Sequence, residues 1–247
     1  MPQNTICKTV RQYNKTQISQ EDMAKLQEIA EDYRKVKNYV YRHYGGISGL
    51  SKIYPGYTVQ NEMTAAKLRE ELGLPSVYFY LAVFDALGDI KGQWTRTKSS
   101  ILKKVNHNDR LTLEEKHFLR FLLKVNNGFD AVLNHKEVAL RHDLQKQFDH
   151  LASEIDVKKL ENYMRRQVRN LHVRLSSDTA DGFSLAERAY RYEDHGIYIT
   201  VKEKRKRIFI PLTDNNQYAR QLYVKLFPEE RNIEINVPVN VAVKRHK

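Results

Sequence analysis

The hydrophobic pattern of this chain changes period twice, and this change constrains the fold more than any other feature. Residues 5–13 and 196–243 carry apolar side chains largely at alternate positions, the period of a β-strand. Between them the spacing is three and four, the period of an α-helix. An N-terminal strand needs a partner for its backbone groups. The sequence therefore predicts an α+β fold in which residues 1–17 and 183–247 form a small antiparallel β-barrel around an inserted helical domain, 18–182.

The longest predicted helix covers residues 74–104, and Pro75 with Ser76 favours a helix start. One broad apolar stripe runs along this helix, made by Val77, Tyr80, Leu81, Phe84, Leu87, Ile90 and Trp94. After Ile90 the segment turns basic around Trp94, the only tryptophan. Two interpretations stay open: a core helix with a solvated tail, or a helix that also contacts an anionic partner.

Caps and breaks predict the remaining elements. Thr112 and Glu115 have the spacing of a capping box, and Gly73 is placed to end a helix. The predicted helices are 19–44, 64–72, 112–127, a further one ending at 151, 157–175 and 217–226. The predicted loop and linker are 47–61 and 176–182, and the predicted hairpin and final strands are 196–212 and 232–243.

The composition favours a polyanionic partner. The chain has 42 Lys and Arg against 30 Asp and Glu, a formal charge of +12 and a pI of about 9.6. Its 15 Tyr and 9 Phe are interleaved with these cations and provide faces on which bases can stack. Because membranes and acidic proteins also attract cations, charge alone does not identify the partner.

Cysteine content and hydropathy exclude several classes of protein. Cys7 is the only cysteine, so neither a disulfide within the chain nor a cysteine-based zinc site, which needs about four ligands, is available. No apolar run approaches the roughly 18–20 residues of a membrane span, and the N-terminus lacks the apolar core of a signal peptide. We therefore expect a cytoplasmic protein with no membrane partner.

The patterns of known catalytic and metal sites are missing. Five histidines fall within 107–150, but none forms H-E-x-x-H or a pair at i, i+4. Asp85 and Asp89 lie four apart, which a solvated helix face explains. No phosphate-binding loop or serine-nucleophile motif occurs. We expect no catalytic residue, metal or cofactor, although a site assembled from distant residues stays open.

Two clusters of cations stand out as nucleic-acid contacts. Arg165, Arg166 and Arg169 have the spacing that gathers side chains on one helix face, where they would contact successive phosphates. The second cluster lies at the tip of the predicted hairpin, and it comprises Lys204, Arg205, Lys206 and Arg207. Charged hairpin tips also occur for solubility alone, so that alternative stays open for the second cluster.

The order of these segments resembles TnpB, the RNA-guided nuclease of bacterial insertion sequences, and the related type V CRISPR effectors. The likeness is carried by a basic first strand, by NYVYRHYGG, by LPSVYFYLAVFDALGDIKGQW, and by YRYEDHGIYITVKEKRKRIFIPL after a helical block. It spans nearly the whole chain, as a pattern rather than a diagnostic signature. In that family a helical recognition domain interrupts a wedge β-barrel, the same split topology.

The resemblance implies partners and contact residues. The wedge would bind guide RNA, and the helical domain would hold the duplex of guide and target DNA. Ser76, Val77 and Tyr78 fall where the family reads a short motif beside the double-stranded target DNA, with Tyr57 and Asn61 assisting. Contacts with the nucleic-acid backbone are expected from Lys91, Trp94, Arg96 and Lys98, with Trp94 stacking if exposed and belonging to the core if buried.

The sequence departs from the family at its end. The family's RuvC-like nuclease would begin where this chain stops, at Lys247, and the single cysteine excludes the zinc ribbon. The resemblance thus implies an amino-terminal half, a truncated product or a nuclease-less form, which binds guide RNA and target DNA without cutting and whose nuclease half is separate or missing. The alternative is a DNA-binding protein or transcriptional repressor that acts without RNA.

Overall fold

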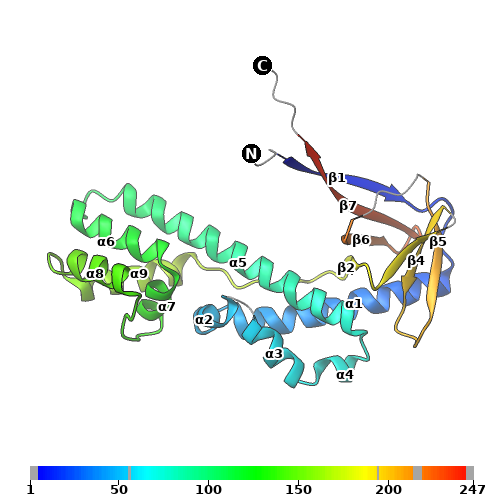
Figure 1. Cartoon of the computed structure of the whole chain (residues 1–247), viewed down its shortest axis with the longest axis horizontal. Helices are drawn as coiled ribbons and strands as arrows, with labels where there is room; N and C mark the ends of the chain where they lie inside the picture. The colour runs from blue at the N-terminus through cyan, green and yellow to red at the C-terminus, as the bar shows by residue number, and fades with distance from the viewer. Residues whose placement is uncertain (1–4, 55–56, 194, 214–218, 243–247) are drawn as a thin grey trace, which may run out of the picture. The chain divides into compact units, whose positions relative to one another are not determined.

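The computed structural model describes residues 5–54, 57–193, 195–213 and 219–242, and it has a mixed α+β architecture (Figure 1). The chain folds into two compact units. The sheet unit comprises Met1–Tyr39, Gln60–Asp85 and Ser177–Lys247, and the helical unit comprises Val40–Val59 and Ala86–Ser176. Helices α1 and α5 contribute residues to both units. The domain boundaries derived from the sequence stay a prediction.

Both ends of the chain build the larger sheet of the sheet unit. Strand β1 (Thr5–Tyr13) pairs antiparallel with β7 (Asn232–Ala242), and Val10 lies opposite Val237. The strand order is β1-β7-β6-β2, completed by β6 (Gln221–Phe227) and β2 (Gly182–Ala186). Figure 1 shows the first and last strands side by side. The prediction that the N-terminal strand joins the C-terminal strands is confirmed.

A second antiparallel sheet contains β3 (Tyr190–Glu193), β4 (Gly196–Thr200) and β5 (Arg207–Pro211) in that order. The predicted hairpin is thus formed by β4 and β5. The predicted closed barrel is wrong, because the described strands form two separate sheets. Closure needs every strand to bond two neighbours. Outside the named strands of the described chain, only one isolated bridge is found, between Asn14 and Leu212.

The inward faces of these strands form the core of the sheet unit together with α1 (Gln20–Tyr44). Alternate residues of β5 and β6 are buried, as the period of two requires, whereas β2 buries three consecutive residues. The buried strand residues include Phe183, Leu185, Ile197, Ile199, Ile208, Ile210, Leu222, Val224, Leu226, Ile233, Ile235 and Val237. On α1, Leu26, Ile29, Tyr33 and Val36 recur at helical spacing and are buried with them.

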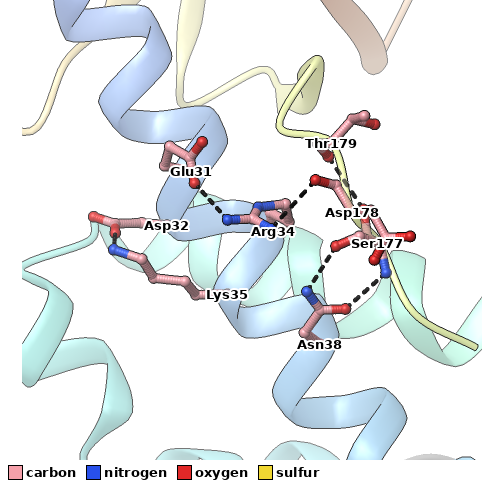
Figure 2. A network of polar contacts seen from close by, with 8 residues as sticks. All are labelled: Glu31, Asp32, Arg34, Lys35, Asn38, Ser177, Asp178 and Thr179. Carbon is pink, nitrogen blue, oxygen red and sulfur yellow. Dashed lines mark hydrogen bonds and ion pairs between the residues drawn. The ribbon is translucent and has the colours of Figure 1, made fainter.

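Polar bonds fix the segment before β2 against α1 (Figure 2). The side-chain amide of Asn38 donates to the Ser177 carbonyl at 2.9 Å and accepts from the Ser177 amide at 2.8 Å. One nitrogen of Arg34 pairs with Glu31 at 2.8 Å, and another donates to the Asp178 carbonyl at 3.5 Å. The predicted linker therefore has its first residues bonded to α1, because Asn38 replaces the backbone partners that an irregular segment lacks.

The helical unit is held by an apolar centre built from the later part of α5 and from three of the four helices that follow it. Helix α5 (Ser76–Asn106) has bounds close to the predicted ones. It is followed by α6 (Leu113–Lys124), α7 (Asn126–Leu133), α8 (His142–Ala152) and α9 (Val157–Leu171). The buried residues of this unit include Trp94, Ile101, Phe118, Leu122, Phe129, Val132, Leu160, Met164 and Val168.

Three element predictions are wrong. The helix predicted to end at residue 151 is divided into α7 and α8, because residues 134–141 are not helical. The segment expected as a loop at 47–61 contains a 3-10 turn (Ile47–Gly49), α2 (Leu50–Ile53) and the start of α3 (Tyr57–Ala65), after which comes α4 (Leu68–Leu72). The short helix expected at 217–226 is instead strand β6 over its described part. In β6, Leu222, Val224 and Leu226 are buried while Tyr223 is exposed, so buried and exposed side chains alternate as in a strand. The antiparallel pairing with β7 directs the buried residues toward the core.

Candidate nucleic-acid interface

Positive charge is concentrated in the helical unit. This unit holds 20 of the 42 Lys and Arg residues but only 11 of the 30 Asp and Glu residues, so it carries +9 of the formal charge of +12. Excess charge of one sign on one unit raises the local concentration of counter-charged ligands. The helical unit is therefore the part of the chain best suited to attract an anionic ligand.

A groove in the helical unit collects several of these cations. It has a volume of about 1060 Å³ and is lined by residues of α5, α6 and α8 and by Tyr54. We call it the basic groove. Its apolar lining is Leu102, Phe121, Leu123, Val125, Leu144 and Leu151. Its polar lining is Thr95, Lys98, Ser99, Asn106, His117, Arg120, Lys124, Asn126 and Gln147.

Helical periodicity explains why these residues meet. On α6, His117, Arg120, Phe121 and Lys124 recur at three- and four-residue spacing, so one face of the helix presents them together. The opposite stripe of α6, which includes Phe118 and Leu122, is buried in the core. On α5 the lining residues Lys98, Leu102 and Asn106 are spaced by four, and on α8 Leu144, Gln147 and Leu151 are spaced by three and then four. Each helix thus contributes one face to the basic groove.

Two cations of the basic groove, Lys98 and Arg120, are bonded to neutral partners. Lys98 donates from Nζ to Asn126 Oδ1 at 2.8 Å, and its ammonium lies 4.4 Å from the centre of the Phe129 ring. Two guanidinium nitrogens of Arg120 donate to Asn106 Oδ1, at 3.0 and 2.9 Å. Across the described ranges, no ion pair joins a carboxylate to Lys98, Arg120 or Lys124. Their charge is therefore uncompensated within the described part of the chain.

Burial perturbs one of these cations strongly. Desolvation lowers the pKa of Lys98 from 10.5 to about 8, because its half-buried ammonium has lost water without gaining a carboxylate. A bound anion would stabilise the charged ammonium and so compensate for its lost hydration. The basic groove is in this respect better matched to an anion than to an apolar molecule.

The α5 residues predicted to contact the nucleic-acid backbone differ in their exposure and in their contacts. Lys98 lines the basic groove, Arg96 is exposed and donates to Gln93, and Lys91 lies with its ammonium 5.3 Å from the Tyr54 ring. Trp94 is fully buried: its ring stacks on His172 at 3.7 Å and meets Phe129 edge-on at 6.0 Å. The prediction of Trp94 as a stacking contact is therefore wrong, and the alternative of a core residue holds.

Of the residues predicted to contact DNA beside the target motif, some are exposed and one is buried. Tyr57, 69% exposed, begins α3, and Asn61 is exposed on the same helix. Ser76 is exposed and Val77 half-buried in the first turn of α5. Tyr78 is fully buried, and its hydroxyl donates to the Thr200 carbonyl at 2.6 Å. Its predicted contact with DNA is wrong, because the whole side chain belongs to the core of the sheet unit.

The arginines of α9 do not form one face. Arg165, whose side chain is only 15% exposed, donates to the Val132 carbonyl at 2.7 Å and to Asn162. It thereby satisfies a carbonyl in the last turn of α7, which has no partner inside that helix. Arg166 and Arg169 are exposed. The predicted trio is therefore reduced to a pair, and Arg165 instead joins two helices.

The predicted residues of the β4–β5 turn are exposed. Lys204, Arg205 and Arg207 lie at the surface, and Lys206, also exposed, pairs with Glu203. Lys202, just before the turn, is held by Glu28 and Asp32 of α1, each at 2.7 Å. The ion pairs of Lys202 thus fix the start of the turn to α1, while the cations of the turn stay exposed.

Three residues of the basic groove, His117, Arg120 and Lys124, were missed by the sequence prediction. Their spacing on α6 is visible in the sequence, but a cationic face beside an apolar stripe is ordinary for a surface helix. Only the packing of α5 and α8 makes that face the wall of a groove. Within the part of the chain that the structure describes, no group of three or more His, Cys, Asp or Glu side chains could hold a metal ion.

Comparison with models of protein families yields no match, and no curated protein matches the sequence either. In the residues whose placement is described, no helix combines the length and apolar character needed to cross a membrane. The resemblance drawn from the order of the segments stays a prediction.

Proposed function

We propose that this protein binds nucleic acid and that the basic groove is one of its contact surfaces. The observation that carries the proposal is the set of three cations, Lys98, Arg120 and Lys124, which line an apolar floor and form no ion pair with a carboxylate in the described ranges. Phosphates would meet the cations, and the apolar lining with the exposed Tyr54 offers contact to sugars or bases. Amphipathic polyanions match both features.

The finer proposal names guide RNA and target DNA as the ligands. It rests on the resemblance to TnpB-like proteins and is supported by a sheet made from both chain ends, with helices between them in sequence. In this proposal the sheet unit is the counterpart of the wedge and binds guide RNA, while the helical unit holds the guide–target duplex. The chain binds without cutting, and its setting is the cytoplasm. The alternative is a DNA-binding protein or repressor that needs no RNA.

The test removes two groove cations and compares salt dependence. The variant Arg120→Gln/Lys124→Gln and the wild type are titrated with single-stranded RNA, duplex RNA and duplex DNA over a range of salt concentrations. Removing one phosphate-binding cation lowers the steepness of log Kobs against log[salt] by about 0.7 for single strands and about 0.9 for duplex DNA. We expect a weaker complex whose salt dependence falls by the equivalent of one to two phosphates.

The matched control is Lys146→Gln/Lys158→Gln, which removes the same charge from exposed positions of the same unit outside the groove lining. It should change affinity far less. Equal losses of affinity in the two variants would mean that only net charge matters. A wild-type protein that binds none of the three ligands in a salt-sensitive way would overturn the proposed function itself.

A further inference from the structure

The outward face of the β3–β4–β5 sheet carries an aromatic row that the proposed contacts do not use. Arg191 on β3 lies opposite Tyr198 on β4, and Tyr198 lies opposite Phe209 on β5. We call these three residues, two aromatic rings and the arginine beside them, the aromatic row. The other face of the same strands is apolar and buried, with Ile197, Ile199, Ile208 and Ile210. Polar side chains are the usual occupants of the solvent-facing side of such a sheet.

The two rings of the aromatic row lie close together and reach solvent. Their centres are 4.8 Å apart with an angle of 43° between the planes, and Phe209 is 38% exposed. The Arg191 guanidinium lies 6.0 Å from the Tyr198 ring. A Cβ at Gly196 would come within 2.6 Å of the Phe209 ring, so this glycine allows the ring to lie over the backbone of β4. The position of Phe209 is thus set by the neighbouring strand.

Cations surround the aromatic row. Arg207 is exposed two residues before Phe209 on β5 and lies opposite Thr200, to whose hydroxyl oxygen its Nε donates at 3.3 Å. The turn that joins β4 and β5 adds exposed Lys204 and Arg205. Glu193 pairs with Arg191 of the row itself, and Glu203 pairs with Lys206; among the described residues, neither carboxylate forms an ion pair with Arg207, Lys204 or Arg205. An aromatic surface therefore lies within a positively charged border.

We propose that the aromatic row is a stacking site for unpaired nucleotides of a single-stranded segment of RNA. One or two bases stack on Tyr198 and Phe209, and Arg207 with the turn cations contacts the adjacent phosphates. This proposal rests on the proposed function. It adds that the nucleic acid bound by the sheet unit is single-stranded RNA.

The chemistry separates this ligand from others. A duplex keeps its bases stacked on each other, so exposed rings gain little from it, whereas every unpaired base has a free face for an aromatic side chain. Positive charge beside the rings fits the phosphates that accompany each base. An apolar protein partner would gain from the rings but not from the cations.

The experiment uses Tyr198→Leu/Phe209→Leu, which keeps apolar side chains on the strands and removes the aromatic faces. Wild type and variant are titrated with fluorescent single-stranded oligouridylate and with an RNA duplex of equal length. Stacking contributes about 1–3 kcal/mol per base. We expect affinity for the single strand to fall at least about tenfold and affinity for the duplex to be retained.

The control is Tyr13→Leu/Phe84→Leu, which removes two exposed aromatic rings elsewhere in the sheet unit. It should leave both affinities unchanged. If the Tyr198→Leu/Phe209→Leu variant binds the single strand as well as the wild type does, the aromatic row only stabilises the sheet and the inference is overturned. The proposed function would survive that result, provided that the groove variant still loses salt-sensitive binding.

A second measurement needs no variant and holds even if the double substitution unfolds the sheet. Oligouridylate containing 5-iodouridine is photo-crosslinked to the wild-type protein, and the linked peptides are identified by mass spectrometry. Crosslinks at Tyr198 or Phe209 support the site. Crosslinks confined to other segments contradict it.

Discussion

Lys98 is the residue of the proposed binding groove whose protonation is most affected by burial. Its ammonium is half-buried between Asn126 and the Phe129 ring, and the loss of water lowers its pKa to about 8. A lysine whose folded-state pKa lies below its unfolded value opposes folding while it is protonated. This cost is fully present below about pH 8 and disappears above the unfolded value near 10.4. A bound phosphate would offset it by stabilising the charged form.

We therefore predict that nucleic-acid affinity falls as the pH is raised from 7 to 9. The protonated fraction of free Lys98 drops across this range because it passes through a pKa of about 8, and only the ammonium attracts phosphate. Binding should be accompanied by proton uptake near pH 8, which calorimetry in buffers of different ionisation enthalpy measures. The Lys98→Arg variant, charged throughout, should bind with little pH dependence over the same range. A wild-type affinity that is flat from pH 7 to 9 would exclude Lys98 from the contact.

Trp94 illustrates the opposite case, a residue whose setting suggests contact but whose side chain is core. His172 stacks on it, and the two ring nitrogens of His172 are bonded to Thr97 and to the Gly45 carbonyl. Desolvation lowers the pKa of His172, with the nearby Arg174 acting in the same direction. The indole nitrogen of Trp94 is buried with no partner in the described part of the chain. The stack thus fixes the segment after α9 to α5.

At the level of elements, α6 is the helix on which the basic groove depends. Its N-terminus is closed by a capping box in which the Thr112 hydroxyl accepts from the Glu115 amide and Glu115 accepts from the Thr112 amide. Glu115 also accepts from Lys159 of α9 at 2.8 Å, and this bond, together with the Thr112 amide, lowers the pKa of the Glu115 carboxyl. The cap therefore joins the start of one helix to a second helix.

We predict that Thr112→Ala lowers the free energy of unfolding by about 1 kcal/mol, within the usual range of about 0.5–2 for removal of such a cap. The reason is that the Glu115 amide at the helix start loses its side-chain acceptor. Chemical denaturation followed by circular dichroism measures the change. The control Ser100→Ala, at an exposed position of α5, should have an effect below about 0.5 kcal/mol. Equal effects of the two substitutions would show that the capping box contributes nothing.

At the scale of the whole molecule, the two units differ in charge and in the surfaces they expose. The helical unit carries most of the net charge and the basic groove, and the sheet unit carries the aromatic row. Cations around a groove contact phosphates irrespective of sequence, whereas aromatic rings require unpaired bases. If both proposed surfaces bind nucleic acid, their combination favours a ligand with both duplex and single-stranded parts over duplex DNA alone.

We predict that the purified protein carries RNA and that RNase treatment weakens its binding to target DNA. The measurement is sequencing of the copurifying nucleic acid, followed by DNA titration before and after RNase digestion. In the guide-RNA proposal a discrete RNA species is found and DNA binding falls after its removal. DNA binding that is unchanged by RNase, from a preparation free of discrete RNA, would instead support the alternative of an RNA-independent DNA-binding protein.

Local signals in the sequence were enough to define most single elements. Period two over residues 5–13 predicts β1, the apolar stripe from Val77 predicts α5, and Thr112 with Glu115 predicts the cap of α6. These features depend on neighbours within a turn or a strand, so they are readable from spacing alone. The positive charge that suggests a polyanionic ligand is likewise a property of composition.

Tertiary structure alone decided which side chains remain accessible and which meet. Spacing places Trp94, Tyr78 and Arg165 on helix faces, but their burial depends on His172, Thr200 and Val132, which are distant in the chain. The same holds for the two open sheets in place of a barrel, and for the register that aligns Arg191, Tyr198 and Phe209. Periodicity states which face of an element is apolar, whereas the identity of its partner is set by packing between segments that no local pattern connects.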